Sequence, residues 1–214
     1  MSSTSESPLL TSLLDAVPVM PVVVIDRLED AVPVARALVD GGLPAIELTL
    51  RTPVALEAIR AIATEVPEIL VGAGTIVTPS QAREAQDAGA RFLVSPGATP
   101  SLLAAMIDTR LPFLPGTATV SEVLAVLEAG LTEMKFFPAE ASGGAAFLKA
   151  ISSPVPAARF CPTGGITAAT AGDYLALPNV GCVGGSWLTP ADVLRDGDWA
   201  RVEALARAAA SLAV

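Results

Sequence analysis

Short apolar runs recur along the chain at intervals of roughly 20–25 residues, and this repeat constrains the fold more than any other feature. Each run is separated from the next by a longer amphipathic segment. The runs are Val22–Val24, Ile46–Leu48, Leu70–Ala73, Phe92–Val94, Pro112–Leu114, Met134–Phe137, Arg159–Cys161 and Gly181–Val183. Because nearly continuous apolar strands are typical of sheets covered on both faces, the runs predict parallel strands.

The segments between these runs carry the capping signals of helices. Thr-Pro pairs open several of them and glycine follows several last turns, as expected at helix ends. The predicted helices are Leu28–Val39, Pro53–Glu65, Pro79–Ala88, Pro100–Thr109, Val120–Ala129, Gly143–Ile151, Ala168–Leu175, Pro190–Val193 and Trp199–Leu212. Thr52 is the expected cap of the second. Repeated strand–helix units predict the α/β class, a single (β/α)8 TIM barrel. An open doubly wound sheet is the alternative.

The length of 214 residues suits one domain that spans residues 1–214. Leucines 9, 10, 13 and 14 and Val17 recur at helical spacing after a Ser-Pro pair. We therefore expect a short N-terminal helix over residues 8–17 that covers the bottom of the barrel, with residues 1–7 frayed.

The chain contains no histidine, and this absence excludes several classes of catalytic and metal-binding site. Without histidine, Ser-His-Asp and Cys-His catalysis and histidine metal sites are ruled out. The net charge of −9, with no cluster of basic residues, argues against nucleic-acid or anionic-membrane partners. Cys161 and Cys182 lack metal or redox spacing, so we expect buried reduced thiols and a cytoplasmic location. No signal peptide or apolar run of about 18 residues is present.

The second predicted strand, around Ile46–Leu48, contains polar residues, which are unusual in a strand that is buried in the core. Period-two alternation places Glu47, Thr49 and Arg51 on one face and the apolar residues on the other. We expect the polar set to face the barrel axis and its mouth, where ligands of such folds bind. A Glu47–Arg51 structural salt bridge is the alternative.

The sixth strand carries one of only two lysines, Lys135, among apolar neighbours. The other lysine, Lys149, is expected on a solvated helix face. A buried lysine can lose its proton and attack a ketone to form a Schiff base, which arginine cannot do. Dry apolar surroundings favour the neutral amine. A Lys135–Glu47 ion pair without chemistry is the alternative.

Paired glycines follow the last two strands, in Thr163-Gly164-Gly165-Ile166 and Gly184-Gly185-Ser186-Trp187. Exposed backbone N–H groups at adjacent strand ends, with a helix start nearby, can hold a phosphate. Two tight turns without a ligand are the alternative. The glycines of Val71-Gly72-Ala73-Gly74-Thr75 predict close approach to either a ligand or a neighbouring helix.

Together these motifs resemble the bacterial family of 2-keto-3-deoxy-6-phosphogluconate (KDPG) aldolase, which is also 4-hydroxy-2-oxoglutarate (KHG) aldolase. The resemblance runs from about residue 21 to 199. The segments that carry it are Ile46–Pro53 (I-E-L-T-L-R-T-P), Val71–Thr75 (V-G-A-G-T), Val94–Gly97 (V-S-P-G), Lys135–Glu140 (K-F-F-P-A-E), Cys161–Ile166 (C-P-T-G-G-I) and Gly184–Leu188 (G-G-S-W-L).

The resemblance implies a class I lyase of the Entner–Doudoroff pathway of carbohydrate metabolism. It makes Lys135 the residue that forms the imine with pyruvate and Glu47 the acid/base, and it places the pyruvate carboxylate on Arg51 and Thr75. We further expect Pro96 and Phe137 to line the pyruvyl pocket and Thr163 to contact a substrate hydroxyl, with Gly164, Gly165, Gly185 and Ser186 holding the phosphate. It also implies a homotrimer with no metal or other cofactor.

Two departures from the family pattern are visible. Val120 stands where a proline usually precedes the helix, and Ala168–Gly172 lacks an asparagine. Neither falls on an assigned residue. A sugar-phosphate isomerase or epimerase without an imine, and a non-catalytic phosphate-binding barrel, stay open alternatives. The sequence does not rank KDPG against its galactonate epimer or KHG.

Overall fold

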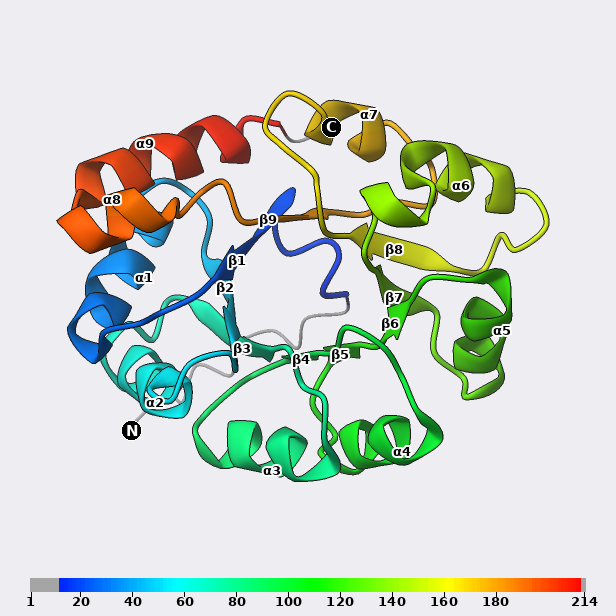
Figure 1. Cartoon of the computed structure of the whole chain (residues 1–214), viewed down its shortest axis with the longest axis horizontal. Coiled ribbons are helices and arrows are strands. Elements are labelled where there is room, and N and C mark those ends of the chain that lie inside the picture. Colours follow the sequence, from blue (N-terminus) through cyan, green and yellow to red (C-terminus); the bar gives the residue numbers. More distant parts are fainter. Residues whose placement is uncertain (1–11, 213–214) are drawn as a thin grey trace, which may run out of the picture.

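Strands and helices alternate along the computed structural model, which describes residues 12–212. The strands are β1 (Val19–Val23), β2 (Ala45–Thr49), β3 (Leu70–Gly74), β4 (Leu93–Val94), β5 (Phe113–Leu114), β6 (Gly116–Thr117), β7 (Glu133–Phe136), β8 (Arg159–Pro162) and β9 (Val183–Gly185). They lie around a common centre, with the helices outside them (Figure 1). The alternation predicted from the apolar runs is therefore confirmed, but the pairing of the strands differs.

The strands form two parallel sheets instead of a closed eight-stranded TIM barrel, so that prediction is wrong. One sheet has the order β5-β4-β3-β2-β1-β9 and the other β6-β7-β8. The fifth predicted strand, Pro112–Leu114, forms as β5 and pairs with β4. Pro115 follows it and has no N–H to donate to a ladder, and the short strand β6 after it pairs with β7. On the other side only the isolated bridges Phe160–Val180 and Thr163–Gly184 join the two sheets.

Most predicted helices form with small shifts of their ends. They are α1 (Ala31–Asp40), α2 (Ala55–Glu65), α3 (Pro79–Asp87), α4 (Pro100–Asp108), α5 (Val120–Glu128), α6 (Gly144–Ile151), α7 (Ala171–Leu175), α8 (Ala191–Asp196) and α9 (Trp199–Ala210), with 3-10 turns η1 (Leu28–Asp30) and η2 (Glu140–Ser142). Thr78, Thr99 and Thr119 cap α3, α4 and α5, and the first two belong to the Thr-Pro pairs that were predicted to open helices. Thr52 does not cap α2, because its hydroxyl donates to the Ile25 carbonyl.

The predicted N-terminal helix over residues 8–17 does not form in its described part, and residues 8–11 lie outside the described residues. Leu13–Ala16 make a bend and a turn. The Leu13 amide donates to the Glu133 carboxylate at 3.2 Å, and Asp15 pairs with Arg159 at 2.6 Å. Glu133 and Arg159 are the first residues of β7 and β8. These contacts therefore fix the segment against the amino ends of the strands, and they replace the backbone hydrogen bonds that a helix would make.

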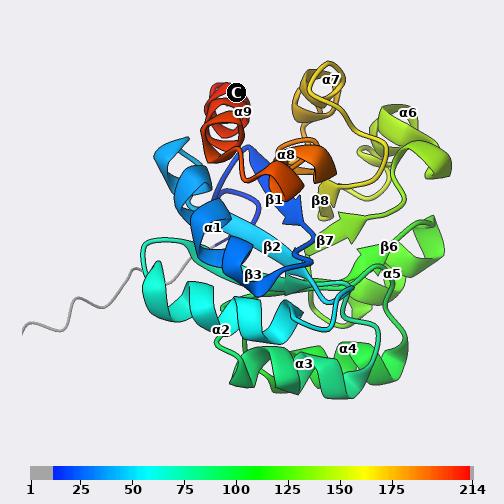
Figure 2. The same cartoon turned by 60° about the vertical axis from the view of Figure 1, so that its left-hand side comes forward.

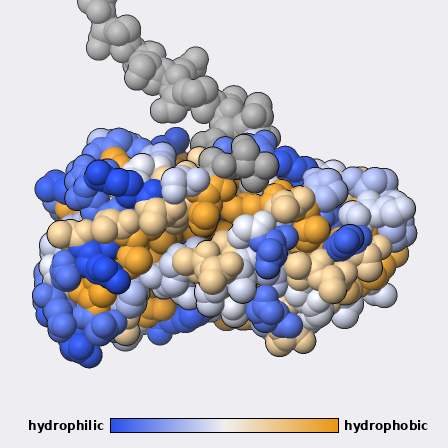
Figure 3. Space-filling model, turned by 90° about the horizontal axis from the view of Figure 1, so that it is seen from above, coloured by the Kyte–Doolittle hydropathy of each residue, from blue (hydrophilic) through white to orange (hydrophobic). Residues whose placement is uncertain are grey.

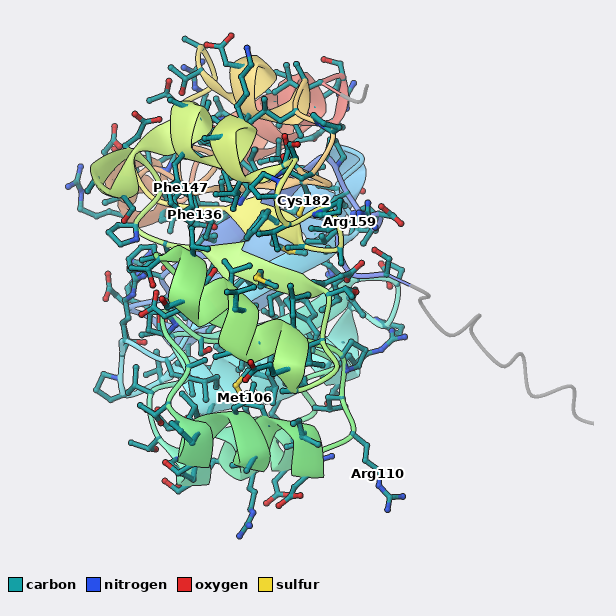
Figure 4. The ribbon with its side chains drawn as sticks, turned by 90° about the vertical axis from the view of Figure 1, so that its right-hand side faces the viewer. Met106, Arg110, Phe136, Phe147, Arg159 and Cys182 are labelled. Atoms are coloured by element: carbon teal, nitrogen blue, oxygen red, sulfur yellow. The ribbon has the colours of Figure 1, made fainter. Side chains whose placement is uncertain are left out.

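The core is one cluster of aliphatic and aromatic side chains between the sheets and the helices. Helices α1, α2 and α3 cover the sheet that contains β1, β2 and β3 (Figure 2). On the other sheet, Phe136 of β7 stacks on Phe147 of α6 with ring centroids 5.0 Å apart, and Figure 4 shows the two rings side by side. This packing fixes β7, which carries Lys135.

The outer surface over α9, α7 and α6 mixes hydrophilic and hydrophobic residues (Figure 3). α1 packs against α9, and Gly41 lets them approach closely: a Cβ there would lie 2.4 Å from the Ala206 methyl. None of the helices in residues 12–212 has the length and hydropathy needed to cross a bilayer.

Candidate active site

A buried ion pair joins a strand of one sheet to a strand of the other. Lys135 Nζ, from β7, lies 3.1 Å from Glu47 Oε1, from β2. The Lys135 side chain is 4% exposed and that of Glu47 is 1% exposed. Two buried charges are costly unless they pair, so each group requires the other. Glu47 pairs with Lys135 and not with Arg51, which excludes the Glu47–Arg51 alternative.

Gly74 makes room for the Glu47 carboxylate. In the parallel ladder β2–β3, Glu47 lies opposite Gly72 and Thr49 opposite Gly74. A Cβ on Gly74 would lie 2.2 Å from Glu47 Oε1, far inside ordinary contact. The sequence predicted that these glycines allow close approach of a ligand or a helix. Gly74 instead admits the Glu47 side chain of the neighbouring strand, and Gly72 lies against the Phe92 ring. Both contacts join residues that are distant in the sequence.

The next polar residue of β2, Thr49, is buried as the alternation predicted, and its hydroxyl donates to the Val23 carbonyl at 3.1 Å. It thereby fixes β2 to β1 and has no free donor for a ligand. The neighbouring apolar side chains Ile46 and Leu48 are fully buried on the opposite face. All five residues of β2 are buried, so burial does not distinguish its two faces; the Glu47–Lys135 contact is the observation that agrees with the predicted polar face.

Phe137 connects the lysine to the glycine pair after β8. Lys135 Nζ lies 5.3 Å from the centroid of the half-buried Phe137 ring, a cation–π distance. The same ring packs on Gly164, where a Cβ would lie 3.3 Å from it. Phe137 thus separates the buried amine from the more exposed Gly164–Gly165 segment.

Arg51 and Thr75 meet beyond the carboxyl ends of β2 and β3. The exposed Arg51 donates from Nε to Thr75 Oγ1 at 3.2 Å. Its two terminal nitrogens stay available to a carboxylate, which a guanidinium binds in a bidentate manner. Thr75 has φ of 60°, a conformation that β-branched residues rarely adopt and that costs about 1–3 kcal/mol. Strain of this kind concentrates at functional sites.

Pro96 lies in the loop after β4, close to the backbone of β6. A Cβ on Gly116 would lie 2.2 Å from the Pro96 carbonyl carbon, and the Gly116 amide donates to Ser95 Oγ at 3.2 Å. Because Gly116 lies opposite Lys135 in the β6–β7 ladder, Pro96 is held on the side of the strand that carries the lysine.

Thr163, Gly164 and Gly165 follow β8 and form a turn of unusual backbone. Gly164 and Gly165 have φ of 105° and 82°, which favours glycine at both positions. Thr163 is 7% exposed, and its hydroxyl fills the space beside Gly184, where a Cβ would lie 2.1 Å from it. Gly184 therefore accommodates Thr163, a role the sequence did not indicate.

Gly185 is the last residue of β9 and Ser186 follows it, and the two differ in exposure. Gly185 is buried against Val19 and Trp187, whereas Ser186 is exposed. Ser186 borders a cavity of about 540 Å³ between the ends of β1 and β9 and helix α8, whose lining also includes Arg27 and Thr189. That lining does not include Lys135 or Glu47, so this space lies beside the ion pair and not over it.

Within residues 12–212, no group of three or more His, Cys, Asp and Glu side chains is arranged to hold a metal ion. Cys161 and Cys182 are both free and buried. Burial and the neighbouring Cys161 thiol raise the pKa of Cys182, with the thiol contact the larger cause. The reactive groups that the structure brings together in this site are the Lys135 amine and the Glu47 carboxylate.

Residues 10–205 match a protein-family model described as KDPG and KHG aldolase. The KHG/KDPG aldolase of Escherichia coli K12 is 54% identical over 198 residues, which covers 92% of this chain and 93% of the relative. The 2-dehydro-3-deoxy-phosphogluconate aldolase of Dickeya dadantii is 56% identical over 197 residues and 92% of both chains.

Solved structures agree with these sequence matches. A KDPG aldolase from Legionella pneumophila, captured with pyruvate at low pH as a covalent carbinolamine intermediate, superposes with a TM-score of 0.90. It is 47% identical, and the match covers 92% of this chain and 96% of that one. A KDPG aldolase from Zymomonas mobilis superposes with a TM-score of 0.87 at 48% identity, covering 93% and 95% of the two chains.

Proposed function

The chain belongs to the family of KDPG and KHG aldolases, and from this premise we propose that it cleaves KDPG to pyruvate and glyceraldehyde 3-phosphate through a Schiff base on Lys135. The observation that supports this assignment is the buried Lys135–Glu47 pair, with 3.1 Å between Nζ and Oε1. A lysine enclosed in this way next to a proton acceptor has the surroundings of a nucleophile.

Glu47 is placed to make the amine reactive. In the proposed first step a proton moves from Nζ to Oε1, 3.1 Å away, which leaves two neutral partners in a site where charges are poorly solvated. The neutral amine attacks C2 of the keto acid. The C2 oxygen receives one proton from Glu47 and one from the attacking amine and leaves as water, which gives the protonated imine and returns Glu47 to its carboxylate form. That cation is the electron sink for the next step.

Cleavage follows from the same two residues. Glu47 takes the proton of the C4 hydroxyl through a water molecule, the C3–C4 bond breaks, and its electron pair moves into the imine to give an enamine. The aldehyde departs. Glu47 then returns the proton to C3, and hydrolysis of the imine releases pyruvate and restores Lys135. No metal or redox cofactor is needed for these steps.

The remaining residues position the two ends of the substrate. Arg51 and Thr75, joined at 3.2 Å, hold the pyruvyl carboxylate at the open end of β2 and β3. Phe137 and Pro96 flank the pyruvyl unit, and Thr163 contacts a hydroxyl of the chain. The terminal phosphate binds to the turn amides, for which the residues are Gly164, Gly165, Gly185 and Ser186. Ser186 is exposed and available to a ligand, while the buried Gly185 contributes through its backbone.

A second activity, cleavage of KHG to pyruvate and glyoxylate, has support from the relative named KHG/KDPG aldolase at 54% identity. The groups that act on the pyruvyl half do not involve the distal phosphate end, so both substrates can use them. A pyruvate-release assay with KDPG, its galactonate epimer and KHG tests the function. Release of pyruvate from KDPG is expected. Isomerisation of a sugar phosphate without pyruvate release, or binding without turnover, would refute it.

We propose a cytoplasmic homotrimer in which α4 and α5 face other copies of the chain. These helices carry the exposed apolar side chains Ile107 (45%), Val120 (39%) and Leu124 (47%), and Figure 1 shows the two helices as neighbours. Burial of such side chains between copies is favourable. Light scattering is expected to give a trimer mass for the wild type and a smaller mass for Leu124→Asp. A monomeric wild type would refute the proposal.

A further inference from the structure

Glu140 and Tyr174 form a contact that the reaction scheme does not use. The Tyr174 hydroxyl, from α7, donates a hydrogen bond to Glu140 Oε1, from η2. Glu140 ends the K-F-F-P-A-E segment that begins with Lys135, and Tyr174 follows the glycine pair after β8. The bond therefore joins the segments that follow two adjacent strands.

The backbone of the same segment is bonded to the turn after β8. The Ala139 amide donates to the Thr163 carbonyl at 2.8 Å, and the Glu140 amide donates to the Gly164 carbonyl at 3.1 Å. The side chain of Glu140 also packs directly on Gly165, where a Cβ would lie 2.6 Å from Glu140 Cγ. Glu140 thus contacts both glycines of the turn.

Tyr174 holds this arrangement from the other side. It is 1% exposed, and burial together with the Glu140 carboxylate raises the pKa of its phenol, so it stays a donor. Gly144 leaves the space that the contact needs, since a Cβ there would lie 3.1 Å from the Tyr174 hydroxyl and 3.7 Å from Glu140 Oε2. The Glu140 residue as a whole is exposed, so its position depends on this partner.

We propose that Glu140 and Tyr174 are positioning residues that hold Gly164 and Gly165 in the conformation that binds the phosphate end of the substrate. Glycine has wide conformational freedom, and a phosphate site built from its amides must be fixed before the ligand arrives. The Tyr174–Glu140 bond fixes it by anchoring the residue that packs on Gly165. This inference rests on the proposed phosphate site.

The experiment compares KDPG, which carries the phosphate, with KHG, which does not. Tyr174→Phe removes the donor and keeps the ring, and Glu140→Ala removes the acceptor. Each is expected to raise the KM for KDPG about tenfold with kcat within about twofold, because one charge-assisted hydrogen bond is lost and only binding is affected. Cleavage of KHG is expected to stay unchanged. Glu140→Gln keeps the stem and an accepting oxygen, and is expected to restore most of the KM.

Asp15→Asn is the matched control, because it removes a carboxylate paired with Arg159 at the amino ends of the strands and is expected to leave the KM for KDPG unchanged. Equal losses for KDPG and KHG, or an unchanged KM for KDPG in both variants, would overturn the inference. If Tyr174→Phe fails to fold, Glu140→Ala tests the same bond from its exposed side. Inhibition of the wild type by inorganic phosphate checks the proposed phosphate site separately, since its absence would refute that site and not only the positioning residues.

Discussion

Gly74→Ala tests whether the position of the Glu47 carboxylate controls the reaction. The added Cβ would lie 2.2 Å from Glu47 Oε1 and 2.6 Å from its Cγ, so the carboxylate must withdraw by about 1.2 Å to reach an ordinary contact of 3.4 Å. That movement breaks the 3.1 Å contact with Lys135 Nζ. A displacement of this size is expected to lower kcat about 10²-fold, and overpacking costs about 1–3 kcal/mol of stability.

The assay measures kcat for pyruvate release together with the free energy of unfolding in urea. The matched control is Gly172→Ala in α7, because nothing lies within 4 Å of the Cβ it adds and alanine favours a helix over glycine by about 1 kcal/mol. The control is expected to keep full activity. A folded Gly74→Ala protein with wild-type kcat would show that catalysis does not depend on the position of the Glu47 carboxylate.

Three further changes probe other parts of the site and fold. Lys135→Met leaves the Glu47 carboxylate buried and unpaired and is expected to cost about 3–5 kcal/mol of stability in urea unfolding, most of which Lys135→Met/Glu47→Gln recovers. Arg51→Lys is expected to raise the KM for the keto acid about tenfold with little change in kcat, because an ammonium cannot bind a carboxylate in a bidentate manner. Hydrogen bonds from the Ala118 amide and neighbouring donors hold the pKa of Glu122 below its usual 4.5. The carboxylate therefore contributes stability above pH 4.5 that is lost as the pH falls through its lowered pKa, and Glu122→Gln is expected to remove this dependence from the melting temperature.

A specific result would contradict each of these three predictions. Additive losses in the Lys135 and Glu47 double variant would mean that the two groups do not depend on each other. A fall in kcat without a rise in KM would show that Arg51 acts in the chemical step. For the pH dependence, Gln81→Glu is the converse test, since Gln81 makes the equivalent capping box on α3 without a titrating group. A pH dependence of stability that is unchanged in both variants would disprove the capping argument.

The sequence predicted the parts of the structure that depend on local patterns. Apolar runs marked the strands, and Thr-Pro pairs marked the starts of α3 and α4. The polar face of β2 was predicted because side chains alternate along any strand. These features follow from a few neighbouring residues, and distant contacts do not change them.

Features that depend on pairing between distant segments were missed or wrong. Pro115 lies between β5, the last strand of one sheet, and β6, the first strand of the other. The apolar pattern does not show this boundary, because proline is itself apolar. The N-terminal segment does not form the predicted helix, because it binds to Glu133 and Arg159, which are more than a hundred residues away in the sequence. The roles of Gly74 and Gly184 depend on the side chains of Glu47 and Thr163, which pack on them from segments distant in the sequence.

The site residues divide in the same way. Lys135 was conspicuous because it is one of two lysines and lies in an apolar strand, and its pairing with Glu47 was among the alternatives that the sequence raised. The contact between Glu140 and Tyr174 was not predicted, because it joins an exposed residue of a short turn to a helix that starts three residues later than expected. An acidic residue next to a predicted phosphate turn is the signal that could have drawn attention to it.

The most direct test of the account is to locate the covalent adduct that forms with pyruvate. The protein is treated with pyruvate and borohydride, and the modified residue is identified by mass spectrometry. The chain has only two lysines, so Lys149→Arg is the matched control for Lys135→Arg. We expect a reduced adduct on Lys135 in the wild type and in Lys149→Arg, and neither adduct nor KDPG cleavage in Lys135→Arg. An adduct at another position, or undiminished cleavage by Lys135→Arg, would contradict it.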